Sequence, residues 1–225
     1  MDLLDWARGP LLAAAIVIFV AGCGWRLWSL LRLPRAQAHG TARHGFGTAA
    51  AAQAALRRFS VPAGFSPSST LVTFNPYLFH IGLAVVFFGY APHIAFVRRL
   101  TGLAWPAAPD AVMYVAAGVT ITSLLLALLF RLTDPVLRRI SRADDILSWT
   151  LTMLPLLTGM AVVGEPSSSL LASHAPVYRV PLAVHLVSLE LLLVWFPFGK
   201  LMHAFLFLPA RMQLATYFGR RGVRA

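Results

Sequence analysis

The sequence predicts an all-α integral membrane protein: a bundle of five transmembrane helices with the N-terminus outside and the C-terminus in the cytoplasm. Hydrophobic residues make up 58% of the 225 residues. Charged residues make up 12%, about half the share of a soluble domain. Five apolar runs reach or approach the roughly 20 residues that a helix needs to cross a bilayer. They cover residues 10–31, 76–97, 111–130, 147–164 and 181–208.

The first apolar run is expected to stay in the protein as a transmembrane helix. It is longer than the apolar part of a signal peptide, and Asp2 and Asp5 make the preceding residues acidic rather than basic. Arginines outside the runs set the orientation. Thirteen fall in segments 32–75 and 131–146 and in the tail after residue 208, and four fall on the other side. The positive-inside rule places the first set in the cytoplasm.

The composition also limits the classes of function. The net charge of +11 is explained by this arginine asymmetry, and without an aromatic-basic module we expect no nucleic-acid partner. Cys23 is the one cysteine, so the chain itself can form neither a disulfide nor an iron–sulfur cluster. A multi-pass protein of the bacterial cell inner membrane is the expected setting, with the lipid bilayer as a partner.

Short loops predict a single membrane domain over residues 1–225. The exception is the cytoplasmic segment 32–75. Its Ala-rich stretch 49–58 predicts a helix, and the Pro/Ser/Gly-rich stretch 61–70 predicts an irregular region. This segment is either a docking surface or a solvated loop. The external loop 165–180 carries His174, which we expect to be merely exposed.

Four histidines lie inside the apolar runs: His80 and His93 in the second, His185 and His203 in the fifth. An ionisable residue in a membrane is costly and indicates function. Counting 1.5 Å per residue from the ends of the runs puts His80 and His203 near the cytoplasmic surface. The same count puts His93 and His185 near the external surface. If the fifth run is one straight helix, the 18 residues between its two histidines are five whole turns, so both share a face.

Two facing imidazoles at one level suit a metal with two axial nitrogen ligands, as in haem. A haem attached through CxxCH is excluded by the sequence, so we expect b-type haem. Zinc is disfavoured because each level offers only two protein ligands. His93 poses a difficulty, because in an ideal helix it points about 140° away from His80. Pro92 precedes it and could distort the helix and turn His93 inward.

Three stretches resemble one family: NPYLFHIGLAVVFFGY at 75–90, SRADDILSWTL at 141–151 and VHLVSLELLLVWFPFGKLMHAF at 184–205. They are similar to the cytochrome b (gamma) subunit of respiratory nitrate reductase. They also resemble the related membrane cytochromes of sulfite-reductase-associated and heterodisulfide-reductase-like complexes. The resemblance covers the second to fifth runs.

The resemblance implies an anchor that carries two haems b and oxidises quinol. His80 and His203 match the ligands of the cytoplasm-side haem, and His185 matches one ligand of the outer haem. The family's usual fourth position is Tyr90 here. The fourth ligand is then His93 or Tyr90, or the outer haem is missing and one haem remains. Electrons would pass to iron–sulfur and catalytic subunits of a membrane complex at the cytoplasmic face.

Two acidic residues are weaker candidates for a catalytic role. Glu190 lies deep in the fifth run and could handle protons, and Asp110 lies near the expected outer quinol region. Two other functions fit the same histidines: a non-catalytic membrane anchor with one haem or none, and a small proton-coupled transporter. The terminal substrate, the quinone type and the direction of electron flow are not specified by the sequence.

Overall fold

The computed structural model describes residues 2–33, 48–57, 67–163 and 179–221. These residues form helices and no strand, which confirms the all-helical prediction. The helices are α1 (Leu3–Arg8), α2 (Pro10–Arg32), α3 (Thr48–Arg57), α4 (Pro67–Gly89), α5 (Ala91–Thr101), α6 (Asp110–Thr133), α7 (Pro135–Ile140), α8 (Ala143–Met160), α10 (Arg179–Trp195), the 3-10 turn Lys200–Met202 and α11 (His203–Arg220). The external loop with His174 and most of segment 32–75 lie outside the described residues.

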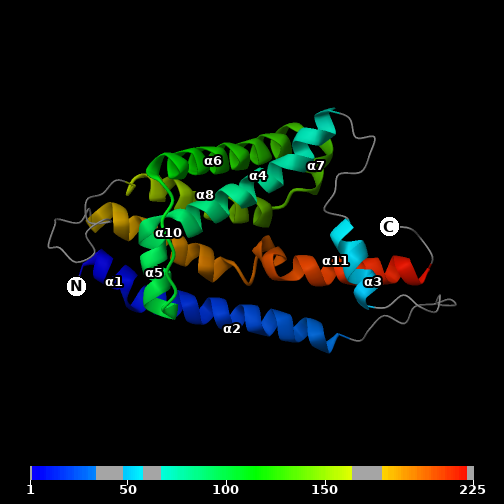
Figure 1. The fold of residues 1–225 in the computed structure, drawn as a ribbon, viewed down its shortest axis with the longest axis horizontal. Coiled ribbons are helices and arrows are strands. Elements are labelled where there is room, and N and C mark those ends of the chain that lie inside the picture. Colours follow the sequence, from blue (N-terminus) through cyan, green and yellow to red (C-terminus); the bar gives the residue numbers. More distant parts are fainter. Residues whose placement is uncertain (1, 34–47, 58–66, 164–178, 222–225) are drawn as a thin grey trace.

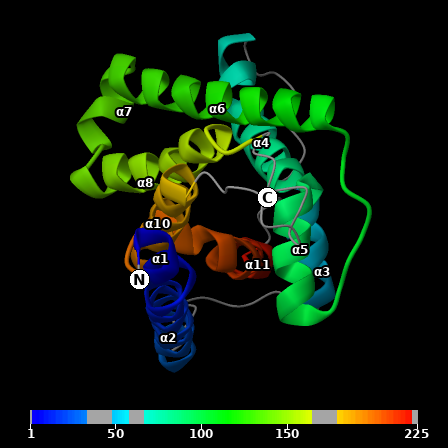
Figure 2. The same cartoon turned by 90° about the vertical axis from the view of Figure 1, so that its left-hand side faces the viewer.

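The long helices run along the long axis of the molecule. α6 and α2 lie on opposite sides, with α8, α10 and α11 between them (Figures 1 and 2). α4 packs on α6, α10 packs on α8 and α2, and α3 packs on α11. α1, α5 and the start of α6 lie toward one end of the molecule, and α3, α7 and the C-terminal part of α2 toward the other (Figure 1).

Three helical stretches of the described residues are long and apolar enough to cross a membrane: Leu3–Arg32, Leu71–Gly89 and Asp110–Thr133. A fourth is added if α10 and α11 together make one broken span. The run 147–164 is not among them. It corresponds to α8, which begins with two aspartates and carries Ser, Thr and Pro along its length. The described structure therefore supports a membrane protein with three or four candidate spans.

The predicted second span, 76–97, is wrong as one continuous helix. α4 begins earlier, at Pro67, and ends at Gly89; Tyr90 is extended (φ −80°, ψ 126°) and α5 starts at Ala91. Figure 1 shows α5 running across the end of α4 rather than continuing it. Pro92 explains the break, because it has no N–H to donate to the preceding turn.

The predicted fifth span, 181–208, is also wrong as one straight helix. α10 ends at Trp195, and the helical stretch after Lys200 is bent from it by 77°. Pro197 lies at the bend with its side chain fully buried. A Cβ on Gly22 of α2 would come within 2.6 Å of the Pro197 ring, so the glycine allows α2 to lie against the bend. Pro209, taken as the end of the span, lies inside α11.

Polar side chains connect the helices. Asn75 on α4 donates to the Ser123 carbonyl on α6 (2.9 Å), and the Ser123 hydroxyl donates back to the Asn75 side chain (2.8 Å). The Trp149 indole on α8 donates to the Leu124 carbonyl (2.8 Å). Buried polar groups need such partners, and each bond holds two helices in one register.

Candidate functional site

One pair of histidines joins α4 to the start of α11. The ring centres of His80 and His203 are 5.9 Å apart and their planes are nearly perpendicular, at 89°. Both side chains are exposed. His80 Nδ1 lies 2.6 Å from the Pro76 carbonyl, and His203 Nδ1 lies 2.9 Å from the Lys200 carbonyl. We call these two residues the inner pair.

A second pair joins α5 to α10. The ring centres of His93 and His185 are 6.3 Å apart and their planes are nearly parallel, at 16°. Both side chains are half-buried. His93 Nδ1 lies 3.2 Å from the Val86 carbonyl, and His185 Nδ1 lies 3.2 Å from the Thr158 hydroxyl. We call these two residues the outer pair.

These hydrogen bonds determine which ring nitrogen carries the proton. A carbonyl oxygen only accepts, so the Nδ1 atoms of His80, His93 and His203 must donate. The Thr158 hydroxyl beside His185 Nδ1 also lies 2.7 Å from the Leu154 carbonyl and 3.0 Å from Ser188 Oγ. In the neutral form the imidazoles of His80, His93 and His203 therefore keep an Nε2 lone pair. This is the pattern of metal-binding histidines, whose other nitrogen is held by a carbonyl or a similar acceptor.

The break between α4 and α5 brings His93 to this position. Breaking the helix leaves carbonyls at the end of α4 without their usual donors. The Val86 carbonyl is near His93 Nδ1, the Phe88 carbonyl accepts from the Trp105 indole (2.5 Å), and the Gly89 carbonyl accepts from Ala108 N (2.9 Å). His93 thus caps α4 while its ring lies beside His185. Tyr90 packs edge-on against His93, with ring centres 5.2 Å apart.

Each histidine pair offers two imidazoles as donors. Among the described residues no group of three or more His, Cys, Asp or Glu side chains could hold a metal ion. Each level thus provides two imidazoles. Two imidazoles bound on opposite sides of one metal, at about 2 Å per bond, have ring centres about 6 Å apart. The ring-centre separations of 5.9 and 6.3 Å are close to that value.

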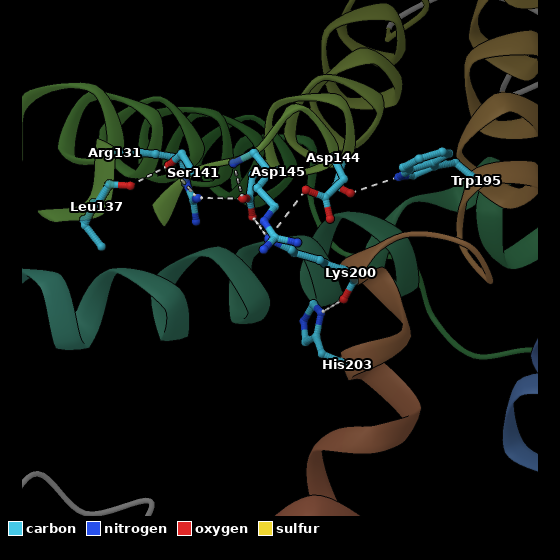
Figure 3. A network of polar contacts seen from close by, with 10 residues as sticks. Arg131, Leu137, Ser141, Asp144, Asp145, Trp195, Lys200 and His203 are labelled. Carbon is cyan, nitrogen blue, oxygen red and sulfur yellow. Dashed lines mark hydrogen bonds and ion pairs between the residues drawn. The ribbon is translucent and has the colours of Figure 1, made fainter. Parts of the chain in front are cut away.

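A charged cluster lies beside the inner pair (Figure 3). The side chain of Asp145, at the start of α8, is 5% exposed and contacts Lys200 at 2.5 Å and Arg131 at 3.2 Å. Lys200 also lies 3.7 Å from Asp144. Burial raises the pKa of Asp145, but the Lys200 and Arg142 N–H donors and the two nearby cations outweigh it. The pKa therefore lies below its ordinary value, and the carboxylate stays charged.

A cavity of about 490 Å³ adjoins this cluster, lined by Arg26 of α2, Asp144, Phe198, Lys200, His203 and Phe207 among others. Lys200 is central to both features. Its ammonium group binds the aspartates while its backbone carbonyl accepts from His203 (Figure 3). The inner pair is thus next to a space with charged and apolar walls.

The two acidic candidates lie in different surroundings. Glu190 is buried in α10, and its Oε1 makes no hydrogen bond to a described residue. Asp110 is exposed at the first position of α6. Neither residue contacts a histidine through a hydrogen bond or ion pair in the described part of the chain.

The arginines of α7 and the first residue of α10 lie in other surroundings. Arg179 pairs with Asp2 (2.5 Å) and Asp5 (3.4 Å) and so joins α1 to the start of α10. The backbone N–H of Asp5 and the Arg179 guanidinium hold the pKa of Asp2 below its ordinary value. Arg138 and Arg139 are exposed on α7. At the inner level the cations are instead Arg26, Arg131 and Lys200.

Sequence reasoning missed several of these residues. Arg26 and Lys200 are charges inside apolar runs, which is a signal of function that could have identified them. Thr158 and Gly159 next to His185 were also missed. A Cβ on Gly159 would lie 3.2 Å from His185 Cε1, so the glycine leaves room for the ring. No sequence pattern distinguishes that glycine from others in the chain.

Comparison with known proteins adds one relative. No protein-family model matches the chain. It is similar to a protein of Nitratidesulfovibrio vulgaris strain Hildenborough, at 28% identity over 217 residues. The alignment covers 94% of this chain and 87% of the relative, so the likeness extends over nearly the whole length of both.

Proposed function

We propose that the chain is a membrane b-type cytochrome subunit, of the kind found with respiratory nitrate reductase and related complexes. In this proposal it takes electrons from quinol and delivers them to a cytoplasm-facing iron–sulfur partner subunit. The chain has a single cysteine, so the cluster must belong to that partner.

The observation that carries this proposal is the arrangement of the four histidines. They form two pairs, with ring centres 5.9 Å apart in the inner pair and 6.3 Å apart in the outer pair. A structural role explains one such histidine by a hydrogen bond to a neighbouring helix. It does not explain why the rings meet in two pairs.

His80 and His203 would hold one haem b, and His93 and His185 the other. When bound, haem b supplies one-electron exchange. The chain's own residues orient the rings. The Pro76, Lys200 and Val86 carbonyls accept from Nδ1 of His80, His203 and His93 and make those imidazoles stronger ligands, and the Thr158 hydroxyl lies against Nδ1 of His185. Tyr90 packs on His93 and is not needed as a ligand in this scheme.

The proposal keeps five spans with the N-terminus outside, in the inner membrane. α8 would then be the fourth span, placed by its packing on α10 and α6 although it is less apolar than the others. The end with α3 and α7 would face the cytoplasm. It carries Arg32, Arg138, Arg139 and Arg142, as the positive-inside rule requires.

Optical spectra test the proposal directly. The full chain, purified in detergent, should show a reduced-minus-oxidised b-type spectrum and two haems per chain by pyridine haemochrome. Reduction by a quinol analogue should produce the same spectrum. One haem per chain would support the anchor version of the protein, and none would refute the cytochrome function.

A further inference from the structure

Arg26 is a charged residue inside a candidate membrane span, where charged residues are rare. It lies on α2, inside the stretch Leu3–Arg32 that is apolar enough to cross a membrane. It is six residues before Arg32, about 9 Å along the helix at 1.5 Å per residue. An arginine at such a depth costs free energy and indicates a functional partner.

The described residues provide no partner for it. Arg26 makes no ion pair or hydrogen bond within the described part of the chain, although Asp144 lines the same cavity. Asp145 binds Lys200 and Arg131, whereas Asp144 lies 3.7 Å from Lys200 and its Oδ1 makes no hydrogen bond to a described residue. Three cations thus lie near two anions at this level, and Arg26 is the one of these three cations that makes no ion pair with a described residue.

Arg26 and His203 line one cavity, so a ligand bound in that cavity would lie next to the Arg26 charge. The volume of the cavity is about 490 Å³, and its wall combines Arg26 and Lys200 with apolar side chains such as Phe198, Met202 and Phe207. A wall with cations at one part and aromatic surface elsewhere matches an amphipathic ligand with an acidic group. Arginine in particular suits carboxylate and phosphate, which it binds with two parallel hydrogen bonds.

We propose that Arg26 is the counter-ion of an anionic oxygen group that binds in this cavity beside His203. Two sources supply that chemistry. One is a carboxylate of a tetrapyrrole held by the inner pair, which rests on the proposed function. The other is the phosphate of an anionic phospholipid, which does not.

The test compares Arg26→Gln and Arg26→Leu with Arg32→Gln in the purified full-length protein. Arg32 is the matched control because it is on the same helix and stacks over Trp28 instead of lining the cavity. Leucine is favourable in a membrane helix, so the Arg26→Leu variant should fold even if the glutamine variant does not. Two quantities are measured: the midpoint potential of each haem, by optical redox titration, and the anionic phospholipid retained per chain, with phosphatidylglycerol vesicles as the probe.

If the carboxylate is the partner, both Arg26 variants lower the midpoint potential at the inner level only. Removal of a positive charge makes reduction of the nearby iron less favourable. If the phosphate is the partner, the potentials stay unchanged and phosphatidylglycerol retention falls by at least half. Arg32→Gln should change neither quantity.

Arg26 variants that match Arg32→Gln in both measurements would overturn the proposal. A purified chain without haem would refute the proposed function instead. In that case phosphatidylglycerol retention alone decides the role of Arg26.

Discussion

The inner and outer histidine pairs each bring two imidazole rings together, but different contacts hold the rings in place. The inner pair is exposed, its rings are perpendicular, and each ring is held by a carbonyl three or four residues away in the chain. The outer pair is half-buried, its rings are nearly parallel, and its hydrogen bonds reach across a helix break and to another helix. The inner pair therefore depends on local backbone and nearby charge, and the outer pair depends on tertiary packing.

Replacing a histidine in each pair should have the largest effect and should separate the two levels. We expect His203→Ala to remove one haem per chain and leave thermal stability nearly unchanged, because its ring is exposed. His93→Ala should remove the other haem and also lower stability by about 1–3 kcal/mol, because the Val86 carbonyl loses its donor. Haem content and thermal unfolding in detergent measure the two quantities. Tyr90→Phe is the control and should keep both haems; a haem lost in that variant would assign the ligand to Tyr90.

The ion pair beside the inner level should contribute a pH-dependent part of the stability. Asp145→Asn leaves Lys200 and Arg131 without their buried partner, and we expect a loss of about 2 kcal/mol, because Lys200 is half-exposed. The pKa of Asp145 is lowered in the folded protein, so its stabilising effect is complete above its ordinary pKa of about 3.9. That effect is lost as the pH falls through the lower folded value.

Thermal unfolding of wild type and Asp145→Asn between pH 3 and pH 7 measures this difference. The two melting temperatures should differ most above about pH 5 and converge in acid. Asp144→Asn is the control, since Asp144 lies farther from Lys200 and is less buried. A constant difference across this range would show that the carboxylate charge is not the stabilising feature.

A single methyl group should give the smallest effect, confined to the outer level. Gly159→Ala would place a Cβ 3.2 Å from His185 Cε1, so the ring must shift by a few tenths of an ångström. We expect a changed spectrum of the outer haem with an unchanged haem count. Gly118→Ala is the matched control, because a Cβ there meets no atom within 4 Å. Identical spectra for the two variants would mean that the ring position near Gly159 does not affect the ligand.

Some of this arrangement could be predicted from the sequence, and the reasons differ between the levels. Counting residues from the ends of the apolar runs pairs His80 with His203 and His93 with His185, and the structure brings those rings together. The argument that His185 and His203 share one straight helix face was wrong, because α10 and α11 are bent by 77°. The apolar run continues through the bend, so periodicity does not reveal it.

The break at Tyr90 was easier to anticipate, because Pro92 marks it. The angle between α4 and α5 could not be anticipated, because it depends on Trp105 and Ala108, which cap the end of α4 from a later loop. Contacts of that kind join residues far apart in the chain. The Asn75–Ser123 bonds were missed for the same reason, and with them the earlier start of α4.

Lys200 links the start of α8 to the inner histidine pair. Its ammonium group binds the aspartates at the start of α8, and its carbonyl accepts from His203 Nδ1. A subunit that docks on the α7–α8 surface and displaces that ammonium group would move the backbone of the 3-10 turn. The imidazole would then lose or gain hydrogen-bond strength, and with it basicity. If the proposed function holds, docking on this surface would change how readily the haem at the inner pair gives up an electron.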